Sequence, residues 1–194
     1  MADPCDSPYV LDIDIGGSLF LGFIVTGVVL LIAGVDLEKV PLMEVLSFTL
    51  LIGSALILLQ AYYGNLSAMN PHDILNCINK GKGKWEEYSN LPEIEKLEKA
   101  YSLASGRAYE AFKASLIGWI IAGVGNAVLG YAIMEGALQY DSPITKLAVV
   151  GGPLLGFTLF VLMIFTYLKH KEYDKQLFAI QLKKSDKAEI SIKI

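Results

Sequence analysis

Four stretches of the chain contain no Asp, Glu, Lys, Arg or His, and polar segments separate them. They cover residues 15–35, 45–63, 114–134 and 147–168. Each is about 20 residues long, which at ~1.5 Å per residue matches the roughly 30 Å hydrocarbon core of a bilayer. The alternative, buried helices of a large soluble protein, would need a polar shell that this chain lacks. The pattern predicts an all-α integral membrane protein, a four-helix transmembrane bundle.

The polar segments divide the chain into five parts. We expect a cytosolic N-terminal segment at 1–14, a transmembrane hairpin at 15–69, a cytosolic loop and helix at 70–113, a second hairpin at 114–168 and a cytosolic tail at 169–194. The loop within each hairpin is short, which predicts that its two helices run antiparallel.

Two of the predicted spans continue as helices outside the membrane. Residues 70–85 are rich in Asn, Gly and Lys and show no periodicity, which favours an irregular loop. From Glu93 onward, apolar residues recur at spacings of three and four, with Asn90 and Glu93 forming a possible capping box. The same spacing continues in the tail at Tyr173, Leu177 and Ile180. These patterns predict cytosolic helical extensions of the third and fourth spans.

The distribution of cations predicts the orientation in the membrane. The chain is 54% hydrophobic with a net charge of -4, and fourteen of its sixteen Lys and Arg residues lie in 70–113 and 169–194. Cytosolic loops carry the excess of Lys and Arg, so this side and both termini are predicted to be cytosolic, with the cell membrane as the default location. Cys5 and Cys77 fall on the same side, where thiols stay reduced. We therefore expect both cysteines to be free and incidental.

Small residues recur along one face of three spans, which favours close helix packing. Small side chains let helix backbones approach where no hydrophobic effect drives association. The third span carries the longest such series and is expected at the centre of the bundle or of a dimer. The predicted packing residues are Gly118, Ala122, Asn126 and Gly130 in the third span, Ser18, Gly22 and Thr26 in the first, and Gly152 and Gly156 in the fourth.

Asn126 is the one strongly polar side chain deep within a span, and its amide needs a partner there. A structural role would be an interhelical hydrogen bond to a residue such as Thr26 or Thr158. A functional role would be to line a path for a solute or ion. Such a path needs further polar residues at the same depth, and these are nearly absent, so the structural role is favoured.

Candidate chemistry is sparse. The spans offer no carboxylate, no paired histidines and no Ser and His couple, so no enzyme activity and no cofactor are expected. His72, Asp73 and Cys77 are too few for a predicted metal site. Three cations beside an aromatic residue could contact anionic lipid headgroups, but a solvated loop that only fixes topology is the favoured interpretation. These residues are Lys80, Lys82, Lys84 and Trp85.

The sequence favours a non-catalytic subunit or scaffold of a membrane assembly. Its expected partners are the lipid bilayer and either a second copy of the chain or another membrane protein, and no nucleic acid. The alternative is a small oligomeric channel or transporter with Asn126 on its path. A third hypothesis is a lipid-modifying enzyme with its site at the cytosolic interface around His72, Asp73 and Trp85.

Overall fold

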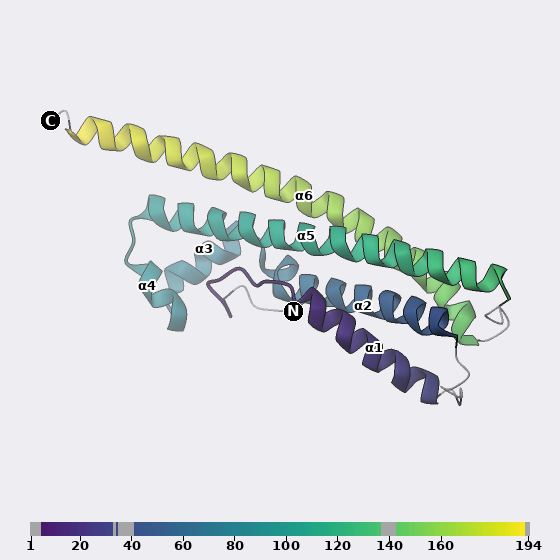
Figure 1. Cartoon of the computed structure of the whole chain (residues 1–194). Coiled ribbons are helices and arrows are strands. Elements are labelled where there is room, and N and C mark those ends of the chain that lie inside the picture. The colour runs from purple at the N-terminus through teal and green to yellow at the C-terminus, as the bar shows by residue number, and fades with distance from the viewer. Residues whose placement is uncertain (1–4, 33, 35–40, 137–142, 193–194) are drawn as a thin grey trace. The chain divides into compact units, whose positions relative to one another are not determined.

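The computed structural model describes residues 5–32, 34, 41–136 and 143–192, with side chains up to Ser185. Within these ranges the secondary structure is helical, without strands, which confirms the predicted all-α class. Figure 1 shows the order of the elements along the chain. They are α1 (Ile15–Ile32), α2 (Leu42–Gly64), η2 (Leu66–Ala68), α3 (Pro71–Lys80), η3 (Gly83–Trp85), α4 (Glu86–Ser89), α5 (Glu93–Met134) and α6 (Pro143–Ile192).

Four of these helices, α1, α2, α5 and α6, are long and apolar enough to cross a membrane. Local signals set where they begin. The Asp14 carboxylate accepts a hydrogen bond from Gly17 N at 2.8 Å and caps α1. Pro143 opens α6, where the first N–H of a helix has no partner to lose. The α5 helix begins at Glu93, as the acidic first turn predicts.

The segment after α2 differs from its prediction as an irregular loop. It contains α3, which Asn70 caps by accepting a hydrogen bond from His72 N at 3.1 Å. The helix ends at Gly81, whose φ of 56° is a left-handed conformation that favours glycine. Its buried residues Ile74, Cys77 and Ile78 follow helical spacing. A single face of only three apolar positions was too short to stand out as periodicity.

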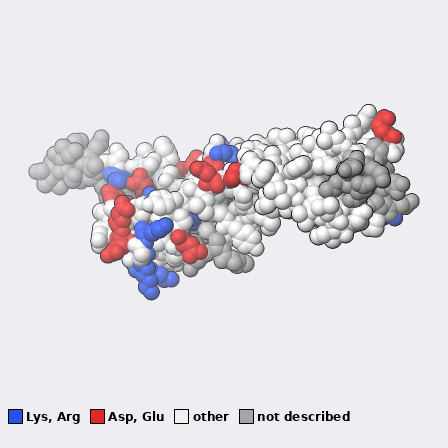
Figure 2. All heavy atoms as spheres, turned by 60° about the horizontal axis from the view of Figure 1, so that its bottom comes forward, with Lys and Arg blue, Asp and Glu red and all other residues white. Residues whose placement is uncertain are grey.

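The chain divides into two compact units. The polar unit comprises Met1–Asp12, Ala61–Phe112 and Ile164–Ile194, and the apolar unit comprises Ile13–Gln60 and Lys113–Met163. The long helices α5 and α6 contribute to both. Figure 2 shows that many acidic and basic side chains gather on part of the visible face, and that much of this face carries few charges. Charged and uncharged surfaces are expected of a protein with water-exposed and lipid-exposed parts.

The polar unit has its own buried core, built by α3, η3, α5 and α6. Trp85 is its largest buried side chain and packs with Ile74 and Ile78. The α5 helix contributes alanines at helical spacing, which bring its backbone close to the neighbouring elements. The α5 residues of this core are Ala100, Leu103, Ala104 and Ala108, and α6 adds Tyr173.

In the apolar unit, glycines mark where the helices come closest. A Cβ added at Gly22 of α1 would lie 2.9 Å from the backbone nitrogen of Gly53 in α2. A Cβ at Gly125 of α5 would lie 3.1 Å from the Leu50 side chain of α2, and a Cβ at Gly118 would lie 3.2 Å from Leu159 of α6. Small residues thus allow close contact of α1 with α2, of α2 with α5 and of α5 with α6.

Candidate functional site

A covalent bond fastens the N-terminal segment to α3. Cys5 and Cys77 form a disulfide with their Cα atoms 5.3 Å apart, within the range usual for native disulfides. The expectation that these cysteines are free and incidental is therefore wrong. Their separation of 72 residues gives no local signal of pairing, and only the fold brings them together.

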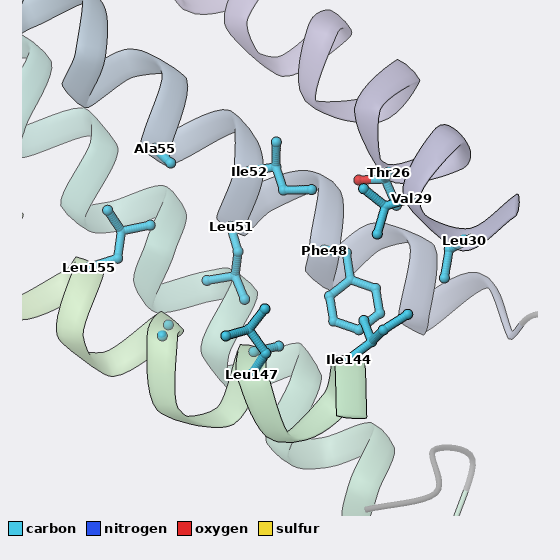
Figure 3. Close-up of a pocket in the computed structure, with 13 residues that line it drawn as sticks. Thr26, Val29, Leu30, Phe48, Leu51, Ile52, Ala55, Ile144, Leu147 and Leu155 are labelled. Atoms are coloured by element: carbon cyan, nitrogen blue, oxygen red, sulfur yellow. The ribbon is translucent and has the colours of Figure 1, made fainter. Parts of the chain in front are cut away.

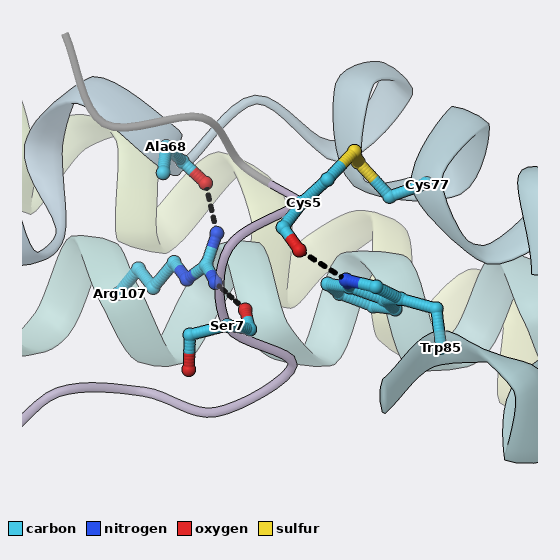
Figure 4. The surroundings of a disulfide bond; sticks show 6 residues. All are labelled: Cys5, Ser7, Ala68, Cys77, Trp85 and Arg107. Atoms are coloured by element: carbon cyan, nitrogen blue, oxygen red, sulfur yellow. Dashed lines mark hydrogen bonds between the residues drawn. A yellow bond between two sulfur atoms is a disulfide. The ribbon is translucent and has the colours of Figure 1, made fainter. Parts of the chain in front are cut away.

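Hydrogen bonds to buried side chains hold the same segment, as Figure 4 shows. The Trp85 indole Nε1 donates to the carbonyl oxygen of Cys5 at 2.8 Å. The Arg107 guanidinium donates to the carbonyl oxygens of Ser7 and Ala68, and to that of Tyr9 at 3.4 Å. We call the segment 5–11, with the side chains that hold it, the N-terminal clamp.

Arg107 is the most unusual member of the clamp because its cationic side chain is buried, with 2% of the residue exposed. Burial lowers the pKa of its guanidinium below the ordinary value. Its described partners are backbone carbonyls, and its Nε has no hydrogen-bond partner among the described residues. Guanidinium suits this role, since its planar fork can serve several carbonyls at once.

Asn65 closes the other end of the clamp, where the segment approaches α1. Its Nδ2 donates to the carbonyl oxygen of Leu11 at 2.7 Å, and its Oδ1 accepts from Leu11 N at 3.2 Å. The residue is fully buried. The Asn65 amide thus binds both the backbone N–H and the backbone carbonyl of Leu11, which fixes the position of the segment along the chain direction.

Ser105, His170 and Asp174 form a second polar cluster in the polar unit. Ser105 Oγ donates to Asp174 Oδ1 at 2.6 Å and lies 2.9 Å from His170 Nδ1. His170 Nε2 is 3.6 Å from Asp174 Oδ2. The serine hydroxyl donates its hydrogen bond to the aspartate, and only 4% of the residue is exposed, so it is not placed as a nucleophile with the histidine as its base. The cluster joins α5 to α6.

Further along the same two helices, charged side chains join α6 to the first turns of α5. Lys184 Nζ lies 3.2 Å from Glu95 Oε1 and 3.0 Å from Glu98 Oε2. Gln181 Nε2 also donates to Glu98, at 3.2 Å. Hydrogen bonds from Lys184 and Gln181 lower the pKa of the Glu98 carboxyl, and the same carboxylates raise the pKa of Lys184.

Some of the small residues predicted to mediate packing lie in contacts between helices, and others face open space. On α1, Ser18 and Thr26 are buried, and Gly22 meets α2. On α5, Gly118 and Ala122 are enclosed. Two others have open space where a Cβ would lie: Gly130 on α5 and Gly156 on α6.

Asn126 packs against Gly152 of α6, and a Cβ at Gly152 would collide with its Oδ1. Its Nδ2 donates to the carbonyl oxygen of Ala122, one turn back in the same helix, at 2.9 Å. Neither Thr26 nor Thr158, the partners expected from the sequence, is joined to it. Both threonine hydroxyls donate to carbonyls of their own helices. This arrangement serves helix packing and gives no support to a polar path.

A second series of small residues lies on another face of α5, which the sequence analysis did not single out. Gly123, Ala127 and Gly130 recur at spacings of four and three and are exposed. A Cβ at Gly123 or at Gly130 would meet nothing within 4 Å. We call Gly123, Ala127 and Gly130 the outer face of α5.

The apolar unit contains an open groove of about 290 Å³ between α1, α2 and α6. Figure 3 shows Phe48 and Leu51 of α2 facing it, with Leu147 of α6 on the opposite side. Its lining is apolar apart from the Thr26 hydroxyl. The residues are Thr26, Val29, Leu30, Phe48, Leu51, Ile52, Ala55, Ile144, Leu147, Ala148, Gly151, Gly152 and Leu155.

The residues proposed for lipid headgroups and for chemistry are not gathered in one place. Lys80, Lys82 and Lys84 are exposed, whereas Trp85 is 2% exposed and bonded to Cys5, so Trp85 does not share their surface. His72 and Asp73 lie exposed in the first turn of α3. Among the described residues, no group of three or more His, Cys, Asp or Glu side chains could hold a metal ion.

In comparisons with known proteins, no family model matches this chain, and neither does any curated protein or any solved structure.

Proposed function

We propose that the chain is a multi-pass protein of the cell membrane that acts as a non-catalytic subunit or scaffold of a membrane assembly. The four long apolar helices support its placement in the bilayer. The polar clusters described above all bind one part of the chain to another. Their side chains hydrogen-bond to other parts of the chain, as a scaffold requires. A catalytic site would instead need side chains that can reach a substrate.

The outer face of α5 is the observation that carries this proposal. The opposite side of the helix uses Gly118, Ala122 and Gly125 to pack within the chain. Gly123, Ala127 and Gly130 offer the same small-residue geometry with nothing against them. In a bilayer, such a face lets a second helix approach closely enough for van der Waals contact along the backbone. The partner is a transmembrane helix, from a second copy or another protein.

We further propose that the polar unit is cytosolic, because fourteen of the sixteen Lys and Arg residues lie in 70–113 and 169–194. The Cys5–Cys77 bond runs against this orientation, since disulfides are rare in reducing compartments. The clamp offers a physical reason for its survival. Trp85, Arg107 and Asn65 hold the segment in place, so the two thiols of a reduced molecule would remain close together. One thiol would exchange with oxidised glutathione to form a mixed disulfide, and the neighbouring thiol would displace reduced glutathione from it and re-form the bond.

Gentle extraction of the tagged full chain from its native membrane tests the scaffold function. Mass spectrometry identifies what copurifies with the wild type, with Ala127→Leu and with Val150→Leu. The leucine at 127 covers the outer face of α5, whereas Val150 is an exposed apolar residue of α6, so Val150→Leu changes the lipid-facing surface by one methylene only. A stoichiometric partner or second copy that is lost from Ala127→Leu and kept by Val150→Leu supports the proposal.

A wild-type chain that leaves the membrane as a lone monomer, with nothing bound in stoichiometric amount, would refute the scaffold function. Loss of the partner from both variants alike would show that the outer face of α5 is not its docking surface.

The orientation is tested separately by adding protease to sealed membrane vesicles that contain the protein with a C-terminal tag. Digestion of the tag only in vesicles whose cytosolic face is outside supports the cytosolic placement. A tag that stays intact in those vesicles contradicts it.

A further inference from the structure

We propose that the groove between α1, α2 and α6 is a binding site for one hydrocarbon chain of a membrane lipid. The groove lies within the apolar unit, and α2 forms its floor through Phe48 and Leu51 (Figure 3). This site is distinct from the outer face of α5. Lipid binding in the groove and the scaffold function both require that the four helices cross the membrane, and they share no other assumption.

The chemistry of the lining excludes polar occupants. Its single hydroxyl, Thr26 Oγ1, donates to the carbonyl oxygen of Gly22 at 2.8 Å and accepts a long hydrogen bond of 3.5 Å from Thr49. The other lining side chains are aliphatic or aromatic. A water molecule needs two to four polar partners, and an ion or sugar needs more, so the groove favours hydrocarbon.

The size of the groove decides between a lipid chain and a partner helix. A helix is about 10 Å wide, so 290 Å³ would hold only about 4 Å of its length, less than one turn of ~5.4 Å. An apolar protein cavity of ~150 Å³ accommodates one benzene ring, and twice that volume suits a chain of roughly ten to twelve carbon atoms. The groove therefore has too little volume to enclose one turn of a helix and enough for a single alkyl chain.

Glycine keeps this space open. Gly151 lies in the lining, four residues from both Leu147 and Leu155, which line the groove from the same face of α6, and a Cβ added there would meet nothing within 4 Å. A side chain at this position is therefore expected to enter the groove. Buried residues such as Leu30 and Phe48 face the space from the other helices. Atoms that line an unfilled space lose dispersion contacts, and a lipid chain restores them.

Vesicles provide the test. The full-length protein is reconstituted into phosphatidylcholine vesicles that contain a trace of phosphatidylcholine with a diazirine in one acyl chain. After illumination, mass spectrometry maps the labelled residues. We expect label at Phe48 and Leu51, which are 6% and 7% exposed and which lipid outside the groove cannot easily reach.

Two matched variants localise the label. Gly151→Leu places four carbon atoms in the groove, about a third of what it holds, and Gly156→Leu adds the same side chain one turn and a half along α6, at a position that also has open space but does not line the groove. Label at Phe48 should fall about threefold or more in Gly151→Leu, because the leucine obstructs a chain lying along the groove. It should persist in Gly156→Leu.

Three results would overturn the proposal. Wild-type label confined to exposed residues such as Phe157, with none at Phe48 or Leu51, would show that no chain enters the groove. Equal labelling of Phe48 in the wild type and in a folded Gly151→Leu would show that the chain reaches Phe48 by another route. Ala55→Leu, which obstructs the groove from α2, decides the matter in the same way if Gly151→Leu does not fold. In a separate experiment, a photoreactive benzophenone side chain introduced at position 48 that crosslinks to a second copy and not to lipid would make the groove a protein interface.

Discussion

The guanidinium of Arg107 donates a hydrogen bond to the carbonyl oxygen of Ser7, a residue one hundred positions earlier in the chain. A buried cation is costly unless it is well bonded, and here carbonyl oxygens of the N-terminal segment accept the hydrogen bonds that water oxygens would accept from an exposed guanidinium. The segment and the arginine therefore depend on each other. Removing either one would therefore loosen the other.

Replacing Arg107 by Met should release the N-terminal clamp. The change preserves most of the side chain's length but removes the donors to Ser7 and Ala68. Hydrogen bonds to charged groups contribute about 1.5–3 kcal/mol each, so the free energy of unfolding should fall by roughly 3 kcal/mol. Hydrogen exchange of residues 5–11 under reducing conditions provides the second measurement. Lys82→Met, at an exposed position, is the control, and equal exchange in both variants would contradict the role given to Arg107.

Gly22→Ala should weaken the packing of α1 on α2. The new Cβ would lie 2.9 Å from Gly53 N and 3.0 Å from Gly53 Cα, and backbone atoms cannot move aside as a side chain can. Overpacking of this kind costs about 1–3 kcal/mol. Gly27→Ala on the same helix meets nothing within 4 Å and should be neutral or slightly stabilising. Unfolding in mixed detergent micelles compares the two, and equal stability would refute the close approach.

Gly152→Ala should be destabilising for a different reason, and a second substitution should rescue it. The new methyl would collide with Asn126 Oδ1 and lie 3.3 Å from Leu51 Cδ2. Asn126→Ala removes the obstacle at the loss of one hydrogen bond within α5, worth about 0.6 kcal/mol. The double variant should therefore unfold less readily than Gly152→Ala alone, with a coupling energy of about 0.5–3 kcal/mol. Strictly additive effects would mean that the two residues do not touch.

Acidification should loosen the pairing of α6 with the start of α5. The Glu98 carboxyl has a lowered pKa because Lys184 and Gln181 bond to its charged form. A lowered pKa contributes stability above the unfolded value of ~4.3, and that contribution is lost as pH falls through the folded value. Lys184, whose pKa is raised, keeps its charge throughout this range. The pairing should thus be intact at neutral pH and weaken below about pH 4.5.

Hydrogen exchange of residues 177–185, corrected for the intrinsic rate at each pH, measures this loosening. Glu98→Gln cannot lose a charge at this position and should show a smaller pH dependence than the wild type. If both proteins respond alike to acid, another group must control the pairing.

The long helices could be predicted from the sequence because their signal is local. An uncharged and mostly apolar run such as 147–168 has one plausible structure in a chain of this composition. The clamp could not be predicted in this way. Arg107 reads as one more basic residue of a polar segment, and nothing near Cys5 in the sequence points to Cys77. Both pairings arise only when the chain is folded, across 100 and 72 residues.

The small-residue series of α5 shows a second limit. Residues spaced by four advance about 400° around a helix of 3.6 residues per turn, so each step drifts by about 40° and three steps by about 120°. Gly118 and Gly130 therefore cannot share one face. Gly118 meets Leu159, whereas Gly130 points to open space. The spacing predicted a packing helix, but the drift determines which of its residues pack within the chain and which remain for another helix.

The bond between Cys5 and Cys77 turns the first part of the chain into a closed covalent ring, and that ring contains both α1 and α2. With the two helices inserted as proposed, the ring crosses the bilayer twice. Closure requires Cys5 to meet Cys77 in α3, so a closed ring marks a molecule in which the N-terminal segment and α3 have come together. A single cut in the loop between α1 and α2 would leave one molecule, which separates into two fragments only when the disulfide is reduced.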